Sequence, residues 1–263
     1  MGAELPIETY HSAGHAVMDI TPLMVGAICV LAASLIVGLT GFGFNLLSVP
    51  LLTLFFPAKS AVVIALVAGS VINMTLAFTS RQAVRHRLLG TILLGSFIGL
   101  SLGALGFVRV TDAYLKLLIS ILTGSFGVRL LVRSSIRRFR VTRGQLVSVG
   151  MLSGTLTAMT GMGGPPLAIY LTRALSNPSH VRSTIAAHSS IASLVAIAGF
   201  GLNGALESTT LQTGAVYVLP GLVGLALGSR LFRGRRSGFA SIVGVTLLLI
   251  GIVSAASAVL ALT

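Results

Sequence analysis

Two glycine-rich runs, each followed by a short apolar segment, are the parts of this sequence best suited to hold a ligand. They are residues 40–45 (TGFGFN) and 161–166 (GMGGPP). Glycine permits a positive φ and lets a ligand approach the backbone. Proline fits the first turn of a helix, where its missing N–H is not needed. Both runs therefore predict a chain break followed by the start of a new helix.

The composition places these breaks in a membrane protein. Apolar residues make up 54% of the 263 residues, charged residues only 9%, and the mean hydropathy is +0.99. A soluble domain carries about 25% charged residues, and disorder requires low hydrophobicity, so both classes are excluded. The net charge of +13 comes from short basic clusters between apolar runs. This pattern is typical of topology signals and argues against a nucleic-acid-binding surface.

A helix that begins at the middle of a membrane exposes about four unpaired backbone N–H groups and a partial positive charge. Hydrocarbon cannot satisfy these groups, whereas an anion supplies both acceptors and charge. The two breaks together predict an anion site near the midplane, with close helix packing through small residues as the alternative for a single run. The predicted substrate-binding residues are Gly41, Gly43, Asn45, Asn73, Thr160, Gly161, Gly163, Gly164, His188 and Ser189.

His188 is the one histidine inside a predicted span, where an ionisable group is a functional hypothesis by default. It could bind the substrate or carry a coupling proton, or it could be a neutral residue that bonds two helices. The helices that follow the breaks carry further polar residues, each with ligand contact and interhelical bonding as the alternatives: Ser70, Asn73, Ser189, Ser190 and Ser193. The lone Cys29 and the scattered other histidines indicate neither a metal site nor a bound cofactor.

The apolar stretches predict an all-α polytopic membrane protein with about eight transmembrane helices. About 20 apolar residues are needed to cross a membrane. Two regions are interrupted at the glycine-rich runs, 22–39 with 46–56 and 145–160 with 167–175. Eleven residues reach about 16 Å, roughly half a bilayer core, so the second piece of each region is predicted to be a broken or re-entrant half-helix. The full-length spans are 58–80, 88–108, 112–132, 183–204, 210–229 and 238–261.

The order of segments in the first half of the chain returns in the second half. Glycines 41 and 43 match glycines 161 and 163 at an offset of 120, and Ser70 matches Ser190 at the same offset. Farther along, Gly99 and Gly103 match Gly224 and Gly228 at an offset of 125. The predicted division is a periplasmic segment 1–21, a first transmembrane repeat 22–133, a basic cytoplasmic loop 134–144 and a second repeat 145–263.

The basic residues set the predicted orientation. Clusters at 81–87, 129–143 and 230–236 belong on the cytoplasmic side by the positive-inside rule. This threading puts 15 of the 18 Lys and Arg residues inside and all five acidic residues outside. Both chain termini are then periplasmic, and the two repeats have opposite orientation. Inverted repeats with paired broken helices are typical of secondary transporters.

The residues around the breaks also carry a family resemblance. The run from Gly41 to Leu52 (GFGFNLLSVPLL) resembles the first-repeat signature of the TauE/SafE family of sulfite and organosulfur-anion exporters. The runs 150–154 (GMLSG) and 160–170 (TGMGGPPLAIY) resemble its second-repeat signature. The resemblance extends over about 22–262. It implies an inner-membrane transporter of small sulfur-containing anions.

The predicted function is secondary transport of a small anion such as sulfite or an organosulfonate, with export as the expected direction. The predicted partners are this substrate, the lipid bilayer and a proton as a candidate coupling ion; nucleic acid is excluded, and the oligomeric state is left open. An anion channel is one alternative, and an intramembrane enzyme using Ser153 with His188 is a weaker one. Neither a Walker A run nor a His-Glu-x-x-His motif is present, so we expect no enzyme.

Overall fold

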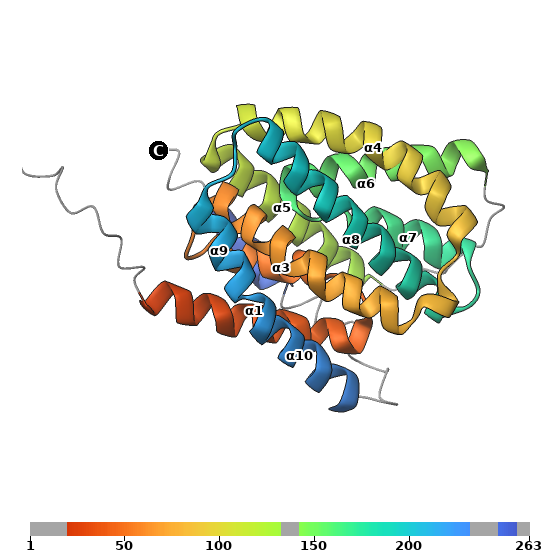
Figure 1. Ribbon diagram of the computed structural model, residues 1–263, viewed down its shortest axis with the longest axis horizontal. Coiled ribbons are helices and arrows are strands. Elements are labelled where there is room, and N and C mark those ends of the chain that lie inside the picture. Colours follow the sequence, from red (N-terminus) through yellow and green to blue (C-terminus); the bar gives the residue numbers. More distant parts are fainter. Residues whose placement is uncertain (1–19, 133–141, 232–246, 257–263) are drawn as a thin grey trace, which may run out of the picture.

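The computed structural model describes residues 20–132, 142–231 and 247–256, and every regular element in these ranges is helical. The predicted all-α class is therefore confirmed (Figure 1). The helices are α1 (Ile20–Thr40), α2 (Phe44–Leu52), α3 (Ala58–Thr79), α4 (His86–Arg109), α5 (Asp112–Leu131), α6 (Arg143–Thr160), α7 (Gly164–Ala174), α8 (Pro178–Leu202), α9 (Ser208–Val216) and α10 (Val218–Leu231), with a 3₁₀ turn at Arg81–Ala83 and a last helix at Leu247–Ala256.

Five of the described helical stretches are long and apolar enough to cross a membrane: Ala58–Thr79, His86–Arg109, Asp112–Leu131, Pro178–Leu202 and Ser208–Arg230. They correspond to five of the six predicted full-length spans. The sixth, 238–261, lies partly outside the described residues. The interrupted regions form two helix pairs, α1 with α2 and α6 with α7, each divided at its glycine-rich run.

Two of the spans differ in detail from the sequence prediction. Helix α8 begins at Pro178 and not at 183, because Asn177 caps it: its side chain accepts a hydrogen bond from the Ser179 N–H at 2.9 Å. The predicted span 210–229 contains a turn at Tyr217 between α9 and α10. Pro220 lies one turn later and has no N–H to donate back to the carbonyl of Val216, so the helix is interrupted there.

One end of the bundle is held by Asp112, the first residue of α5. Its carboxylate accepts hydrogen bonds from the backbone N–H groups of Ala58, at 3.0 Å, and Lys59, at 3.2 Å. These are the orphan donors of the first turn of α3, where a negative charge is stabilised by the helix dipole. The start of α3 and the α4–α5 junction therefore lie at the same end of the bundle.

The basic loop 81–87 lies at the opposite end. The Arg85 N–H donates to the Thr184 hydroxyl at 3.2 Å, and the His180 ring lies 2.8 Å from the Ala83 carbonyl oxygen. The start of α8 is thereby attached to the α3–α4 connection. Helices α3 and α8, which pack against each other, run in opposite directions.

Glycines allow two helix pairs to pack at very short range. Helix α4 carries Gly95, Gly99 and Gly103 on the face that meets α6, and a side chain at any of them would collide with the α6 backbone. Helix α10 presents Gly224 and Gly228 to α1 in the same way. The two pairs lie on opposite edges of the molecule (Figure 1). Such small-residue contacts are typical of helix association in membranes.

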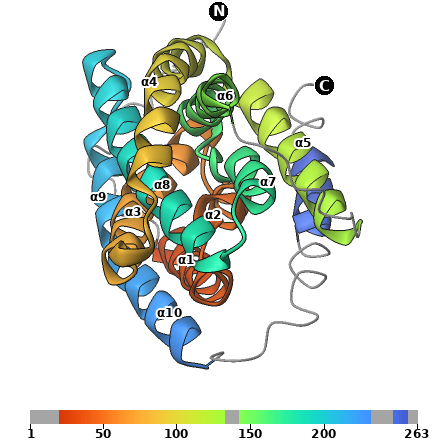
Figure 2. The ribbon, with the colours of Figure 1, turned by 90° about the vertical axis from the view of Figure 1, so that its right-hand side faces the viewer.

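The two short helices lie in the middle of the bundle, enclosed by the longer ones (Figure 2). Eight of the nine residues of α2 are buried. Helix α2 packs against α1, α3 and α5, and α7 packs against α6 and α8. The beginnings of both short helices are thus placed deep inside the protein.

We predict that Gly99→Ala destabilises the protein, because the new methyl group would meet the Met151 carbonyl on α6. Overpacking of this kind costs about 1–3 kcal/mol. Gly90 lies on the same helix with open space at its Cβ position, so Gly90→Ala is the matched control. Thermal unfolding of the purified protein measures both. A midpoint that is equally unaffected by the two substitutions would contradict the close α4–α6 packing.

Candidate functional site

The first break is a sharp turn that only glycine accepts easily. Helix α1 ends at Thr40, and the Gly41 N–H donates to the Val37 carbonyl at 2.6 Å. Gly41 has φ +82° and Gly43, the N-cap of α2, has φ +93°. A side chain at either residue would be strained in this left-handed conformation. Helix α2 begins directly after this turn, and its first three residues are buried in the protein.

The second break is fixed by hydroxyl groups on α6. The Ser153 hydroxyl donates to the Gly163 carbonyl at 2.6 Å. Thr160 donates to the Leu156 carbonyl at 2.8 Å and accepts from the Met162 N–H at 3.3 Å. The Met162 N–H, which lies beyond the end of α6, is thereby paired in a buried region, and the Gly163 carbonyl at the start of α7 is attached to α6.

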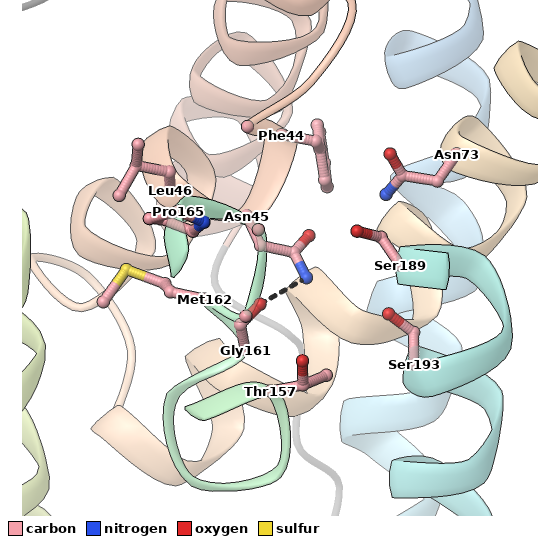
Figure 3. Close-up of a pocket in the computed structure, with 13 residues that line it drawn as sticks. Phe44, Asn45, Leu46, Asn73, Thr157, Gly161, Met162, Pro165, Ser189 and Ser193 are labelled. Atoms are coloured by element: carbon pink, nitrogen blue, oxygen red, sulfur yellow. Dashed lines mark hydrogen bonds between the residues drawn. The ribbon is translucent and has the colours of Figure 1, made fainter. Parts of the chain in front are cut away.

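A direct hydrogen bond joins the two breaks. The Asn45 side-chain amide, in the first turn of α2, donates to the Gly161 carbonyl at 2.8 Å. The two residues are separated by 116 positions in the sequence. This bond brings the N-terminal turns of α2 and α7 to the same place (Figure 3).

A small cavity lies between these two helix starts. Its volume is about 20 Å³, which is room for about one water molecule. None of its thirteen described lining residues has a titratable side chain. The polar groups that face it are hydroxyls, amides and backbone groups, and the positive ends of two helix dipoles point toward it. The lining residues are Gly43, Phe44, Asn45, Leu46, Asn73, Thr157, Gly161, Met162, Gly163, Gly164, Pro165, Ser189 and Ser193.

Seven of the ten predicted site residues line this cavity. The structure thus brings together Gly43, Asn45, Asn73, Gly161, Gly163, Gly164 and Ser189 from four helices and two breaks. Gly41, in the first break, and Thr160, the last residue of α6, lie outside the lining. The Arg182 side chain packs directly on Gly41, and Thr160 holds the end of α6. These two residues shape the breaks.

His188 points away from the cavity lining and toward α4 and α6. It is fully buried, and its Nε2 lies 2.7 Å from the Ser96 hydroxyl oxygen. That oxygen also lies 2.9 Å from the Gly150 carbonyl and 3.0 Å from the Ile92 carbonyl. Since carbonyls only accept and the hydroxyl has one proton, His188 Nε2 is the donor to Ser96. The histidine therefore joins α8 to α4, and Ser96 continues this connection to α6.

Six lining residues were not among the predicted ones, and the sequence held a signal for some of them. Ser193 lies one helical turn after Ser189, and Thr157 lies one turn before Gly161, so helical spacing places them on the same faces. Pro165 and Met162 belong to the second run itself. Phe44 and Leu46 are apolar residues in an apolar segment, and their type gives no indication of a site.

One protein family matches this chain. The sequence model described as sulfite exporter TauE/SafE matches residues 26–254, a range that includes both breaks and all thirteen lining residues. The resemblance seen at 41–52 and 160–170 is thereby confirmed. No curated protein and no solved structure matches the chain.

We predict that His188 acts on stability and not on anion affinity. His188→Ala removes the donor to Ser96 and leaves a cavity, which should lower the free energy of unfolding by about 1–3 kcal/mol. His188→Gln retains an N–H donor and should recover most of this loss, with sulfite affinity within about twofold of wild type. Thermal unfolding and equilibrium binding measure the two effects. A stable His188→Gln protein that no longer binds sulfite would place the histidine in the site.

Proposed function

We propose that this chain, which belongs to the sulfite exporter TauE/SafE family, exports a small sulfur-containing anion such as sulfite or an organosulfonate by secondary transport. The family and the five apolar helical stretches make it a multi-pass membrane protein. The site proposal rests on one observation: the first turns of both short helices line the same cavity. The anion would bind there, between α2 and α7.

The donors available to an anion come mainly from the backbone. The N–H groups of Phe44, Asn45 and Leu46 form the first turn of α2, where they have no partner within the helix. Helix α7 contributes fewer donors, because Pro165 and Pro166 have no N–H. Together with the two helix dipoles, these groups favour a negative charge without a cationic side chain. This supports weak, reversible binding, as a transporter requires.

The lining supports an inverted repeat. Eight of the thirteen lining residues form four pairs in which the members are 120 positions apart: Gly43 with Gly163, Phe44 with Gly164, Asn45 with Pro165, and Asn73 with Ser193. The Ser190 hydroxyl donates to the Ser70 carbonyl at 3.2 Å, again across 120 positions. A contact between equivalent residues is what a two-fold relation between the repeats produces. The cavity would then lie on the pseudo-two-fold axis.

The packing of helices from one half of the chain against helices from the other half also supports a two-fold relation between the repeats. Helix α4 of the first half packs on α6 of the second, and α10 of the second half packs on α1 of the first. Both contacts use the glycines matched at an offset of 125, Gly99 and Gly103 on α4 and Gly224 and Gly228 on α10. Each broken helix is therefore held by a span from the other half. Such an arrangement suits rocking of one repeat against the other.

The size of the cavity favours a carrier over an open channel. Room for about one water molecule is too little for an anion with three oxygens. Helices must therefore move apart for the substrate to enter, as alternating access requires.

Moving one charge through about 100 mV corresponds to about 2.3 kcal/mol, which favours anion exit from a negative cytoplasm. We place the protein in the inner membrane with both termini periplasmic, an orientation that puts the loop 81–87 in the cytoplasm.

Gly164→Ala tests the site with little disturbance of the fold. Gly164 lines the cavity, and no atom lies within 4 Å of its Cβ position, so the methyl group fits but occupies ligand space. We expect sulfite affinity to fall by at least about tenfold, or about 1.4 kcal/mol, with an unchanged unfolding temperature. Sulfite efflux from proteoliposomes should fall with it.

Gly90→Ala controls for the added methyl group, because its Cβ position is equally open but lies outside the cavity. It should transport sulfite as the wild type does. If Gly164→Ala binds and exports sulfite normally, the anion does not occupy this cavity.

A further inference from the structure

The hydrogen bond between the two breaks fixes which way the Asn45 amide faces. The Gly161 carbonyl can only accept, so the Asn45 Nδ2 must lie toward it, at 2.8 Å. The amide oxygen, Oδ1, is therefore directed the other way, on the side that faces Ser189 (Figure 3). The Gly161 carbonyl thus determines the orientation of the amide, because exchanging the amide nitrogen and oxygen would place two acceptors against each other.

The Asn45 Oδ1 is a buried acceptor without a donor. Asn45 is 8% exposed, and its Oδ1 has no hydrogen-bond partner among the described residues. The oxygen lies against Gly69, where a Cβ atom would collide with it. The glycine thus leaves space for the oxygen but offers it no polar side chain. A buried polar atom without a partner is unfavourable and is a place where a ligand group can bind.

Two kinds of polar group consequently border the cavity. The backbone N–H groups at the start of α2 can donate to an anion, as can the Ser193 hydroxyl, which is buried and has no hydrogen-bond partner among the described residues. The Asn45 Oδ1 can only accept. An anion whose surface atoms are all acceptors would leave this oxygen unpaired and would place its own negative charge beside a carbonyl dipole.

We infer that the anion this site selects carries a hydrogen-bond donor next to its charged oxygens, and that Asn45 Oδ1 accepts from that donor. This inference rests on the proposed function of the cavity. The fitting class is a singly charged sulfur oxyanion with an O–H or N–H group on or beside the sulfur. The singly protonated form of sulfite belongs to it, as does sulfamate, whose amino group is bonded to the sulfur.

A comparison of two anions with equal charge and similar size isolates the effect of the hydrogen-bond donor on affinity. Sulfamate has an NH₂ group where methanesulfonate has a CH₃ group, and both are monoanions at neutral pH. Their affinities for the purified full-length protein are measured by displacement of sulfite at one pH. We expect sulfamate to bind about tenfold more tightly, which corresponds to about 1.4 kcal/mol. Because the anions match in size, the movement that opens the cavity affects both equally.

Two variants and one control assign this preference to Asn45. Asn45→Leu removes the acceptor, and Gly69→Ala displaces it together with the neighbouring Phe44 ring while the amide itself is kept, so either variant should bring the two affinities together. Ser48→Ala is the matched control: Ser48 is a buried, unpaired hydroxyl on the same helix, outside the cavity lining, and its loss should leave the tenfold preference intact. If Asn45→Leu does not fold, Gly69→Ala gives the same test.

Three outcomes would overturn the inference while leaving the transport proposal in place: equal affinities in the wild type, tighter binding of methanesulfonate, or a sulfamate preference that survives both variants. If neither anion displaces sulfite and sulfite itself does not bind, the proposed function of the cavity fails, and the inference fails with it.

Discussion

A helix that ends inside a helical bundle leaves backbone N–H and C=O groups without partners in the helix, and two helices of this chain, α1 and α6, end in that way. The carbonyl of Gly161, just after α6, is satisfied from within the protein, because Asn45 donates to it. The N–H groups in the first turns of α2 and α7 have a different environment: they border a cavity whose described lining has no titratable side chain. The two helix dipoles therefore favour negative charge at a cavity whose described lining carries no formal charge.

The rest of the fold keeps those two helix starts in position. Close glycine contacts hold α4 on α6 and α10 on α1, so the long half of each broken helix is attached to a neighbour over much of its length. His188 and Ser96 add a hydrogen bond between α8 and this α4–α6 pair. The stability of the outer bundle and the polarity of its centre are therefore supplied by different residues. This separation lets the site remain small and neutral while the surrounding helices pack tightly.

The parts of the site that could be predicted are those encoded locally. Glycine and proline change the backbone at their own position, so the breaks at 40–45 and 161–166 and the short helices after them could be read directly from the sequence. By contrast, the sequence did not show which face of α8 points toward the cavity. Neighbouring residues on a helix differ by about 100°, and this places Ser189 at the cavity and His188 on the other side of the helix. The turn at Tyr217 was missed because α9 and α10 together form one continuous apolar span.

The most direct test of the paired-break site is to locate the bound anion. Selenite has the shape of sulfite and scatters X-rays anomalously, so a crystal of the full-length protein grown in the presence of selenite would show where it binds. The account predicts an anomalous peak between Gly43 and Gly164, within reach of Ser193. A peak only in the basic surface hollow lined by Arg85 and Arg87, or none inside the bundle, would contradict it.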